Sequence, residues 1–216
     1  MGAEADPAYA EQPLGLFLEL VASRQPAPGG GAAAAIGVAL AAGLAAMVAR
    51  FSAEQFREAS HMAGQADGLR LRAAELAQAD GLAYQRVINA RREARADGDR
   101  RQRVRTAFSA AADVPCEIAR VGATVAELAA RLAQRGNPNL RGDAVTAALL
   151  AEAGVRAAAE LVALNLSAAA IEDGRGRECS GLVGVASAAA RRALSASRRD
   201  RSSGNETGGG LSARPS

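Results

Sequence analysis

The sequence predicts an all-α protein: an antiparallel helical bundle with long buried alanine-rich helices and a disordered C-terminal tail. Two observations carry this prediction. Hydrophobic residues make up 49% of the 216 residues but aromatic residues only 3%, so alanine, leucine and valine must build the core, which suits closely packed helices better than strands. In addition, an uncharged run of small residues from Ala32 to Ala49 has the length and composition of a buried helix.

Length and local composition divide the chain into three segments. Residues 1–12 form a flexible leader, and residues 13–194 fit one helical domain with a substantial core. Residues 195–216 are rich in arginine, serine and glycine, a composition that is typical of disorder. We therefore expect one globular unit followed by a tail.

The first two predicted helices differ in character. A short amphipathic helix spans residues 13–24, with Leu14, Phe17, Leu18 and Val21 at helical spacing. The second helix runs from residue 32 to about 58 and is apolar on every side over its first two-thirds, which places it in the middle of a bundle. A membrane span of the same length is the alternative, but alanine and glycine partition weakly into hydrocarbon and no second span follows.

The remaining helices follow from periodicity and from their end signals. A long surface helix is expected over residues 60–94, and a further helix ends near Ala112 after a polar turn at residues 97–99. The next helix covers residues 116–134 and stops at Gly136, Asn137 and Pro138. A last long helix runs over residues 143–171, with Asp143 as its N-cap. Residues 180–194 complete the bundle.

The segment from Pro26 to Gly31 is the first candidate for a binding site. Prolines extend the chain and three successive glycines, Gly29, Gly30 and Gly31, leave the backbone bare where it enters the second helix. Unpaired N–H groups at a helix N-terminus attract an anionic or carbonyl-bearing ligand. The alternative is that these glycines only allow a tight entry into a buried helix.

The composition excludes several classes of chemistry. No lysine occurs, so Schiff-base catalysis is excluded, and the single histidine, His61, leaves no zinc site or Ser-His pair. Cys116 and Cys179 are too few for a disulfide framework and are expected to be reduced thiols of a cytoplasmic protein. The arginine clusters are interleaved with acids and almost lack aromatic neighbours, which favours solvated helix faces over a nucleic-acid partner. We expect no membrane partner.

Several short motifs, taken in order, are similar to those of a known family. The chain resembles the cyclodeaminase and methenyltetrahydrofolate cyclohydrolase family, which forms the C-terminal part of formiminotransferase-cyclodeaminase. The matching motifs are the Pro26–Gly31 loop with its small-residue helix ending in Met47-Val48, Ala79-Asp80 with Ala83-Tyr84, Val114-Pro115, Gly136-Asn137, Arg141-Gly142-Asp143 and Asn165-Leu166. Together they span about residues 13–171.

The resemblance implies a function and an assembly. Members of this family are helical bundles that form at least dimers and act on one-carbon derivatives of tetrahydrofolate without a metal or a dissociable cofactor. They release ammonia from 5-formiminotetrahydrofolate, or they hydrolyse 5,10-methenyltetrahydrofolate to the 10-formyl compound. The sequence leaves open which of the two reactions applies here.

The resemblance also selects site residues. Both reactions need a positioned acid-base group, and Asp80 and Asp143 are the carboxylates that match family motifs. The resemblance further assigns substrate binding to Pro28, Gly29, Gly30, Gly31, Asn137, Arg141 and Asn165. Each assignment has a simpler alternative: Asp80 as a surface ion pair, Asp143 as a helix cap, Asn137 as a helix end, Asn165 as a self-satisfied core amide and Arg141 as an exposed loop residue.

The chain departs from the family pattern at three places. The family usually carries a Gly-Lys pair after the small-residue helix, where this chain has Arg50 and then Arg57, and arginine cannot exchange protons near neutral pH. Gln78 stands where an acid is common, and Leu161 where a second asparagine is common. A catalytically silent bundle that keeps folate or partner binding is therefore the alternative function.

Overall fold

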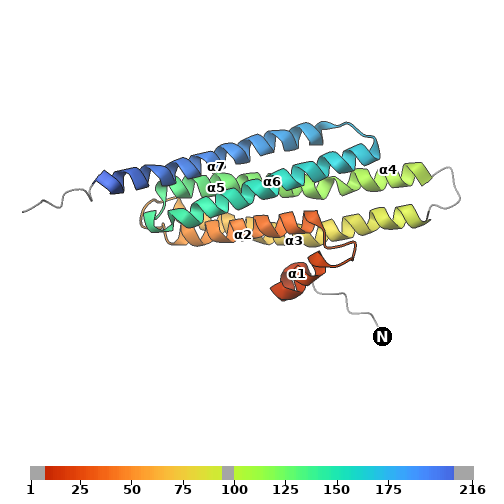
Figure 1. Ribbon diagram of the computed structural model, residues 1–216, viewed down its shortest axis with the longest axis horizontal. Helices are drawn as coiled ribbons and strands as arrows, with labels where there is room; N and C mark the ends of the chain where they lie inside the picture. Colours follow the sequence, from red (N-terminus) through yellow and green to blue (C-terminus); the bar gives the residue numbers. More distant parts are fainter. Residues whose placement is uncertain (1–7, 94–99, 207–216) are drawn as a thin grey trace, which may run out of the picture.

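The computed structural model describes residues 8–93 and 100–206, and within these ranges every regular element is a helix (Figure 1). This confirms the predicted all-α fold class. The predicted leader up to residue 7, the turn at residues 97–99 and the end of the tail from residue 207 lie outside the described residues. The elements are η1 (Tyr9–Glu11), α1 (Leu14–Ala22), α2 (Gly30–Arg50), α3 (Ala59–Glu93), α4 (Arg100–Ala111), α5 (Asp113–Arg135), η2 (Pro138–Leu140), α6 (Arg141–Ala169) and α7 (Gly174–Glu206).

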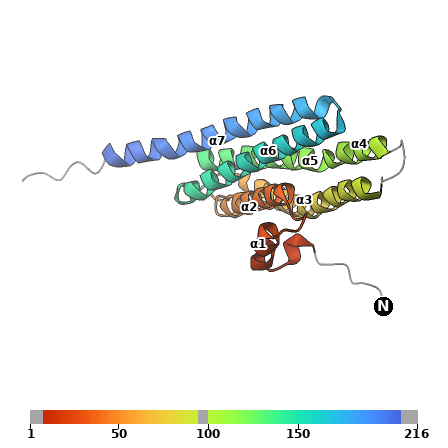
Figure 2. The same ribbon diagram turned by 45° about the vertical axis from the view of Figure 1, so that its right-hand side comes forward.

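Helix α2 packs against α3, α5 and α6 (Figures 1 and 2). Small residues let the helices approach closely: a Cβ added at Gly154 of α6 would collide with Val38 of α2, and one added at Gly122 of α5 would collide with Val155 of α6. Eleven residues of α2 are buried. Helix α2 is long and apolar enough to cross a membrane, and this packing buries its inner side. Leu40 remains 59% exposed, so α2 is not enclosed on every side as its composition predicted.

The N-terminal segment sits beside the bundle. Figure 2 shows α1 projecting from the layer that α2 and α3 form. Phe17 is its only buried side chain and packs at 5.9 Å, ring centre to ring centre, against Tyr9 of η1. Leu14 keeps 67% of its surface exposed. The leader predicted for residues 1–12 thus includes a short ordered helix, which attaches to α3 through a hydrogen bond from the Tyr9 backbone N–H to Gln78 Oε1.

Helix α2 ends at Arg50, eight residues before its predicted end near residue 58. The hydroxyl of the buried residue Ser52 donates to the carbonyl of Val48 and accepts from the backbone N–H of Asn137. Ser52 therefore joins the end of α2 to the turn between α5 and α6. Serine and threonine hydroxyls often bond backbone carbonyls near helix ends in this way. The contact with Asn137 depends on the tertiary fold, so the pattern of apolar residues could not predict it.

Helix α7 is longer than predicted. Its described range begins at Gly174 and continues to Glu206, so residues 195–206 of the predicted tail are helical. Ala193 and Ala196 are buried, and Arg192 of α7 forms an ion pair with Glu127 of α5. Contacts with α5 and α6 therefore carry the helix past residue 194.

The two cysteines lie together inside the α5–α7 contact. Cys116 and Cys179 are buried free thiols with their sulfur atoms 3.4 Å apart. Burial, together with the hydrogen bond to Cys116, raises the pKa of Cys179 to about 12. Because the thiolate is the reactive form, these thiols are protonated and unreactive near neutral pH.

Candidate functional site

The N-terminus of α2 opens into a cavity of about 370 Å³ that three helices enclose. The cavity size is within the range of small-molecule sites. The glycine loop, the middle of α3, the last residue of α4 and the C-terminal part of α6 form its wall. Its lining residues are Pro26, Ala27, Gly29, Gly30, Gly31, Asp80, Gly81, Ala83, Tyr84, Ala111, Leu161, Leu164 and Asn165.

Asp80 of α3 caps the first turn of α2. Gly29 is the N-cap residue of α2 and offers no side chain, while the Asp80 carboxylate accepts a hydrogen bond from the backbone N–H of Ala32. The carboxylate oxygens occupy the place that a Cβ of Gly31 would fill. Glycine is thus required at position 31 so that an acid from another helix can reach the positive end of α2.

Two opposing influences act on this carboxylate. Burial raises the pKa of Asp80 above its usual value, and the hydrogen bond from Ala32 partly offsets that effect. Removal from water disfavours the charged form, whereas an N–H donor favours it. The result is a carboxylate whose pKa has moved toward neutrality while it faces a cavity, an arrangement that suits general acid-base chemistry.

The opposite wall of the cavity is mostly apolar. Leu161 and Leu164 of α6 lie there beside Asn165, whose side-chain amide donates to the backbone carbonyl of Ala111 at 3.1 Å. This bond leaves the amide oxygen of Asn165 as an acceptor at the cavity. Tyr84, one α3 turn beyond Asp80, adds an aromatic ring to the wall.

Tyr9, which belongs to none of the sequence motifs, lies close to Asp80. An added Cβ at Gly81 would lie only 2.8 Å from the Tyr9 hydroxyl oxygen. Burial and the negative charge of Asp80 both raise the pKa of Tyr9. Tyr9 lies in the leader, where no periodic pattern marks it, so only the folded chain reveals this proximity.

The other predicted residues lie at the opposite end of α2. The side chain of Asn137 links its own turn to the end of α2: it donates to the Phe51 carbonyl and accepts from the Asn139 backbone N–H. Arg141 begins α6, and its Nε donates to the carbonyl of Ala133 at 2.9 Å. Asp143 lies in the first turn of α6 and is not its N-cap, because that position belongs to Leu140.

The structure therefore divides the predicted site into two groups. Gly29, Gly30, Gly31, Asp80 and Asn165 share one cavity. The group of Asn137, Arg141 and Asp143 adjoins the end of α2 at Phe51 and Ser52, and a 21-residue helix separates the two groups by about 30 Å.

Pro28, Arg50 and Arg57 lie outside the cavity. Pro28 is buried and does not line the cavity. Arg50 forms an ion pair with Asp67 at the C-terminal end of α2, and Arg57 is exposed. Within one chain, Arg50 therefore lies too far from Asp80 to take the place of the family lysine beside it. Among the described residues, no group of three His, Cys, Asp or Glu side chains is arranged to hold a metal ion.

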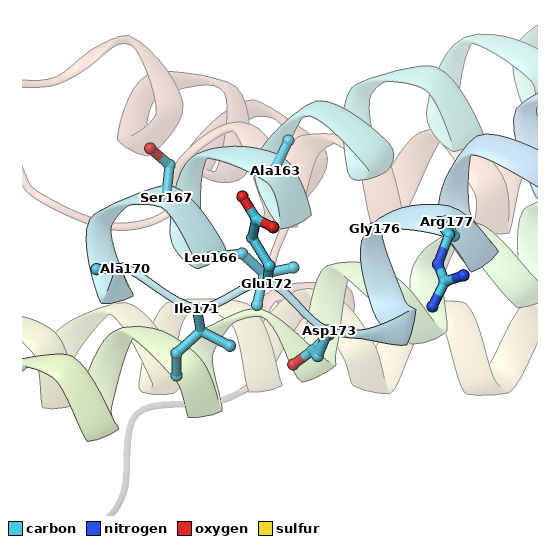
Figure 3. Close-up of a pocket in the computed structure, with 9 residues that line it drawn as sticks. All are labelled: Ala163, Leu166, Ser167, Ala170, Ile171, Glu172, Asp173, Gly176 and Arg177. Atoms are coloured by element: carbon cyan, nitrogen blue, oxygen red, sulfur yellow. The ribbon is translucent and has the colours of Figure 1, made fainter.

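A larger hollow of about 1020 Å³ lies at the turn between α6 and α7 (Figure 3). Glu172, Asp173 and Arg177 project from its rim, and Leu166 and Ile171 supply the apolar part. None of the predicted catalytic or substrate-binding residues lines this hollow. It also lacks a buried carboxylate at a helix N-terminus, so the smaller cavity is the better candidate.

Comparisons with known proteins agree with the fold and with the motifs. The family model described as formiminotransferase-cyclodeaminase matches residues 13–176. A methenyltetrahydrofolate cyclohydrolase of Methylorubrum extorquens is 33% identical over 185 residues, which cover 80% of this chain and 89% of the relative. The crystal structure of formiminotetrahydrofolate cyclodeaminase from Thermotoga maritima is similar with a TM-score of 0.77 and 28% identity, covering 88% of this chain and 97% of that one.

Proposed function

Because the chain belongs to the formiminotransferase-cyclodeaminase family, we propose that it is an enzyme acting on one-carbon derivatives of tetrahydrofolate in the cavity at the N-terminus of α2. The observation that carries this proposal is the Asp80 carboxylate, which is held against the first turn of α2 and faces that cavity. We propose Asp80 as the acid-base residue.

The reacting group of these substrates is a single carbon held by nitrogen. In hydrolysis of the methenyl compound, water adds to this carbon, and Asp80 takes a proton from the water. Asp80 then returns this proton to N5 as the bond between the carbon and N5 breaks. The hydroxyl on the carbon loses its own proton to solvent and becomes the formyl group on N10. The raised pKa of Asp80 suits both transfers, since a carboxyl that titrates nearer to neutrality accepts and donates protons with less cost.

Deamination uses the same residue in a related step. N10 attacks the formimino carbon, Asp80 removes the proton from N10, and ammonia leaves after receiving a proton. We place hydrolysis first, because the bacterial cyclohydrolase matches most of both chains at the higher identity. The two reactions give different products, so an assay separates them directly.

The cavity walls suit a flat, polar ring. Leu161, Leu164 and Tyr84 provide apolar surface for the faces of a pterin, while the Asn165 amide oxygen and the N–H groups of the first turn of α2 provide hydrogen bonds at its edge. Gly29 and Gly30 have nothing near the place of a Cβ, so a ligand can approach their backbone closely.

The direct test is a spectrophotometric assay of the purified protein with 5,10-methenyltetrahydrofolate and with 5-formiminotetrahydrofolate. Loss of the methenyl absorbance reports hydrolysis, and its appearance from the formimino compound reports deamination. Turnover of neither substrate by a protein with a normal helical spectrum would remove the enzymatic proposal. Binding heat from a reduced folate without turnover would instead support the silent bundle.

A further inference from the structure

An apolar groove of about 460 Å³ lies between the N-terminal segment and the layer that α2 and α3 form (Figure 2). Arg70 and Ala74 of α3 line it. Gln78 and Gly81 continue the same side of α3, since the four positions follow one another at spacings of four, four and three. Gly81 also lines the cavity of the candidate site. The groove therefore leads along α3 to the wall of that cavity.

Tyr9 stands at the end of the groove that is nearest to the cavity. Its backbone N–H donates to Gln78 Oε1 at 3.2 Å. Its ring lies against Gly81, where an added Cβ would be 2.8 Å from the hydroxyl oxygen and 3.2 Å from the nearest ring carbon. On its other side, the ring packs against the buried Phe17 of α1. These contacts hold the ring between the groove and the cavity.

The Asp80 carboxylate lies on the same turn of α3, directly before Gly81. It points toward α2, where it occupies the place of a Gly31 Cβ and accepts from the Ala32 N–H. The negative charge of Asp80 raises the pKa of Tyr9. An electrostatic effect of this kind needs a short separation. The phenol and the carboxylate are therefore neighbours in space.

The other surroundings of Asp80 are almost uncharged. Helix α2 has no charged residue before Arg50. Tyr84 of α3 also lines the cavity, and Arg70 lies ten residues before Asp80 on α3, about 15 Å along the helix. The α4 and α6 residues of the cavity wall are Ala111, Leu161, Leu164 and Asn165. Burial, and not a neighbouring charge, therefore raises the pKa of Asp80, so the groups that exclude water from it matter.

Gln78 anchors Tyr9 without adding a charge. Its amide oxygen accepts the Tyr9 N–H. A carboxylate at position 78, where the family commonly has an acid, could accept the same bond. It would also place a second negative charge two residues from Asp80, and a like charge raises the pKa of a carboxyl group. The neutral amide leaves burial as the main influence on Asp80.

We propose that Tyr9 is a positioning residue of the candidate site: its ring closes the seam between α2 and α3, so that the Asp80 carboxylate exchanges protons with the cavity alone. Gly81 has no side chain to fill this place. Tyr9 precedes residues 13–176, the part of the chain that matches the family model, so the family motifs do not account for it. Its role in turnover rests on the proposed function, whereas the closure of the seam does not.

The closure is tested without substrate by a carbon-13 NMR titration of the side-chain carboxyls, in which Asp80→Asn identifies the Asp80 signal. We expect Asp80 to titrate at lower pH in Tyr9→Ala than in wild type, because water then reaches it. Tyr9→Phe keeps the ring and should return the wild-type midpoint. Leu14→Ala, a change at an exposed α1 residue of the same groove, is the matched control. An unchanged midpoint in Tyr9→Ala, or an equal shift in Leu14→Ala, would overturn the proposal.

Gly81→Ala approaches the same contact from α3. Its Cβ would displace the Tyr9 ring, while alanine favours the helix, so the fold should persist. We expect the Asp80 midpoint to move in the same direction as in Tyr9→Ala. The double variant should move it no further than the larger single change, since both substitutions remove one contact. Additive shifts would show that the two residues act independently, against the proposal.

The role in turnover is tested by the pH dependence of kcat/KM with 5,10-methenyltetrahydrofolate. Asp80 must be ionised to take a proton from water, so the acidic limb of the profile follows its titration in the free enzyme. We expect the limb of Tyr9→Ala to move to lower pH, with a loss of about threefold to tenfold near neutral pH because the base is weaker. Tyr9→Phe should return the limb to its wild-type position. An equal loss at every pH would assign Tyr9 to folding alone and overturn the positioning role.

The two proposals fail in different ways. If wild type turns over neither folate but Tyr9→Ala still moves the Asp80 midpoint, the closure of the seam stands and the proposed function fails. If wild type is active and Tyr9→Ala leaves both the midpoint and the acidic limb unchanged, the function stands and the positioning role of Tyr9 fails.

Discussion

Similar polar residues from other segments lie beside the two ends of α2, but their hydrogen bonding differs. At the N-terminal end, Asp80 and Asn165 face a cavity and keep hydrogen-bonding capacity toward it. At the C-terminal end, the Asn137 side chain bonds two groups of its own chain. An asparagine beside a helix end can therefore either present hydrogen-bonding groups to a ligand or hold two segments of the chain together. The pattern of its own bonds decides which.

The largest expected effect is that of Asp80→Asn. The amide keeps the shape of the carboxyl group but cannot transfer a proton, so turnover should fall by about 100-fold or more. The spectrophotometric assay measures this loss, and circular dichroism checks the fold. Turnover within a factor of about three of wild type would show that Asp80 is not the acid-base residue and that the reaction occurs elsewhere.

Asp80→Asn should also change how the free energy of unfolding depends on pH. Because the pKa of Asp80 is raised in the folded state, the folded protein binds this proton more tightly than the unfolded chain does. The stability associated with Asp80 is therefore greatest in acid and is lost as pH rises above the ordinary Asp pKa of 3.8. Asp80→Asn should unfold with a smaller pH dependence above that value than wild type does, as urea titrations at several pH values would measure.

Gly31→Ala should have the next largest effect. Its Cβ would occupy the place of the Asp80 carboxylate, so the acid must move away from the α2 terminus, and turnover should fall by about tenfold or more. Gly64→Ala is the matched control on α3, because nothing lies within 4 Å of its added Cβ. Equal activity of both variants would show that the position of Asp80 is not critical.

Asn165→Ala should weaken substrate binding more than catalysis. The change removes the amide oxygen at the cavity and one hydrogen bond to Ala111. We expect KM to rise about fivefold to tenfold with a smaller change in kcat, since a neutral hydrogen bond contributes about 1 kcal/mol. An unchanged KM would assign Asn165 to packing between α4 and α6.

Asn137→Ala should have the smallest effect on turnover and a clear effect on stability. Its side chain holds the Phe51 carbonyl and the Asn139 N–H, so its loss should lower the free energy of unfolding by about 1–2 kcal/mol. Turnover of the folded fraction should stay close to wild type. A variant of normal stability with a raised KM would instead restore Asn137 to the substrate-binding group.

The sequence predicted the bundle well, because helix formation depends on local information. The apolar run of α2, the Pro-Gly signals and the stripe of α3 are each contained in a short segment. The end of α2 was predicted too late, since Ser52 ends it through a contact with Asn137, 85 positions away in the chain. The continuation of α7 to Glu206 likewise depends on packing against α5 and α6.

The candidate site was predicted only in part, for a geometric reason. Motif order relates Gly31, Asp80 and Asp143 to one family, but it contains no distances. The structure brings Asp80 to Gly31 because α3 packs along α2. It places Asp143 beside the other end of α2, because α6 begins there. Tyr9 was missed because its position depends on how η1 attaches to α3.

Reduced folates are proposed to bind at the N-terminal end of α2. Hydrogen exchange of the full chain, with and without the stable analogue 5-formyltetrahydrofolate, tests it directly, since bound ligand slows exchange of the amides it covers. Binding at this end should protect residues 29–33 and 80–84. Protection confined to residues 163–177, around the larger hollow, would contradict it.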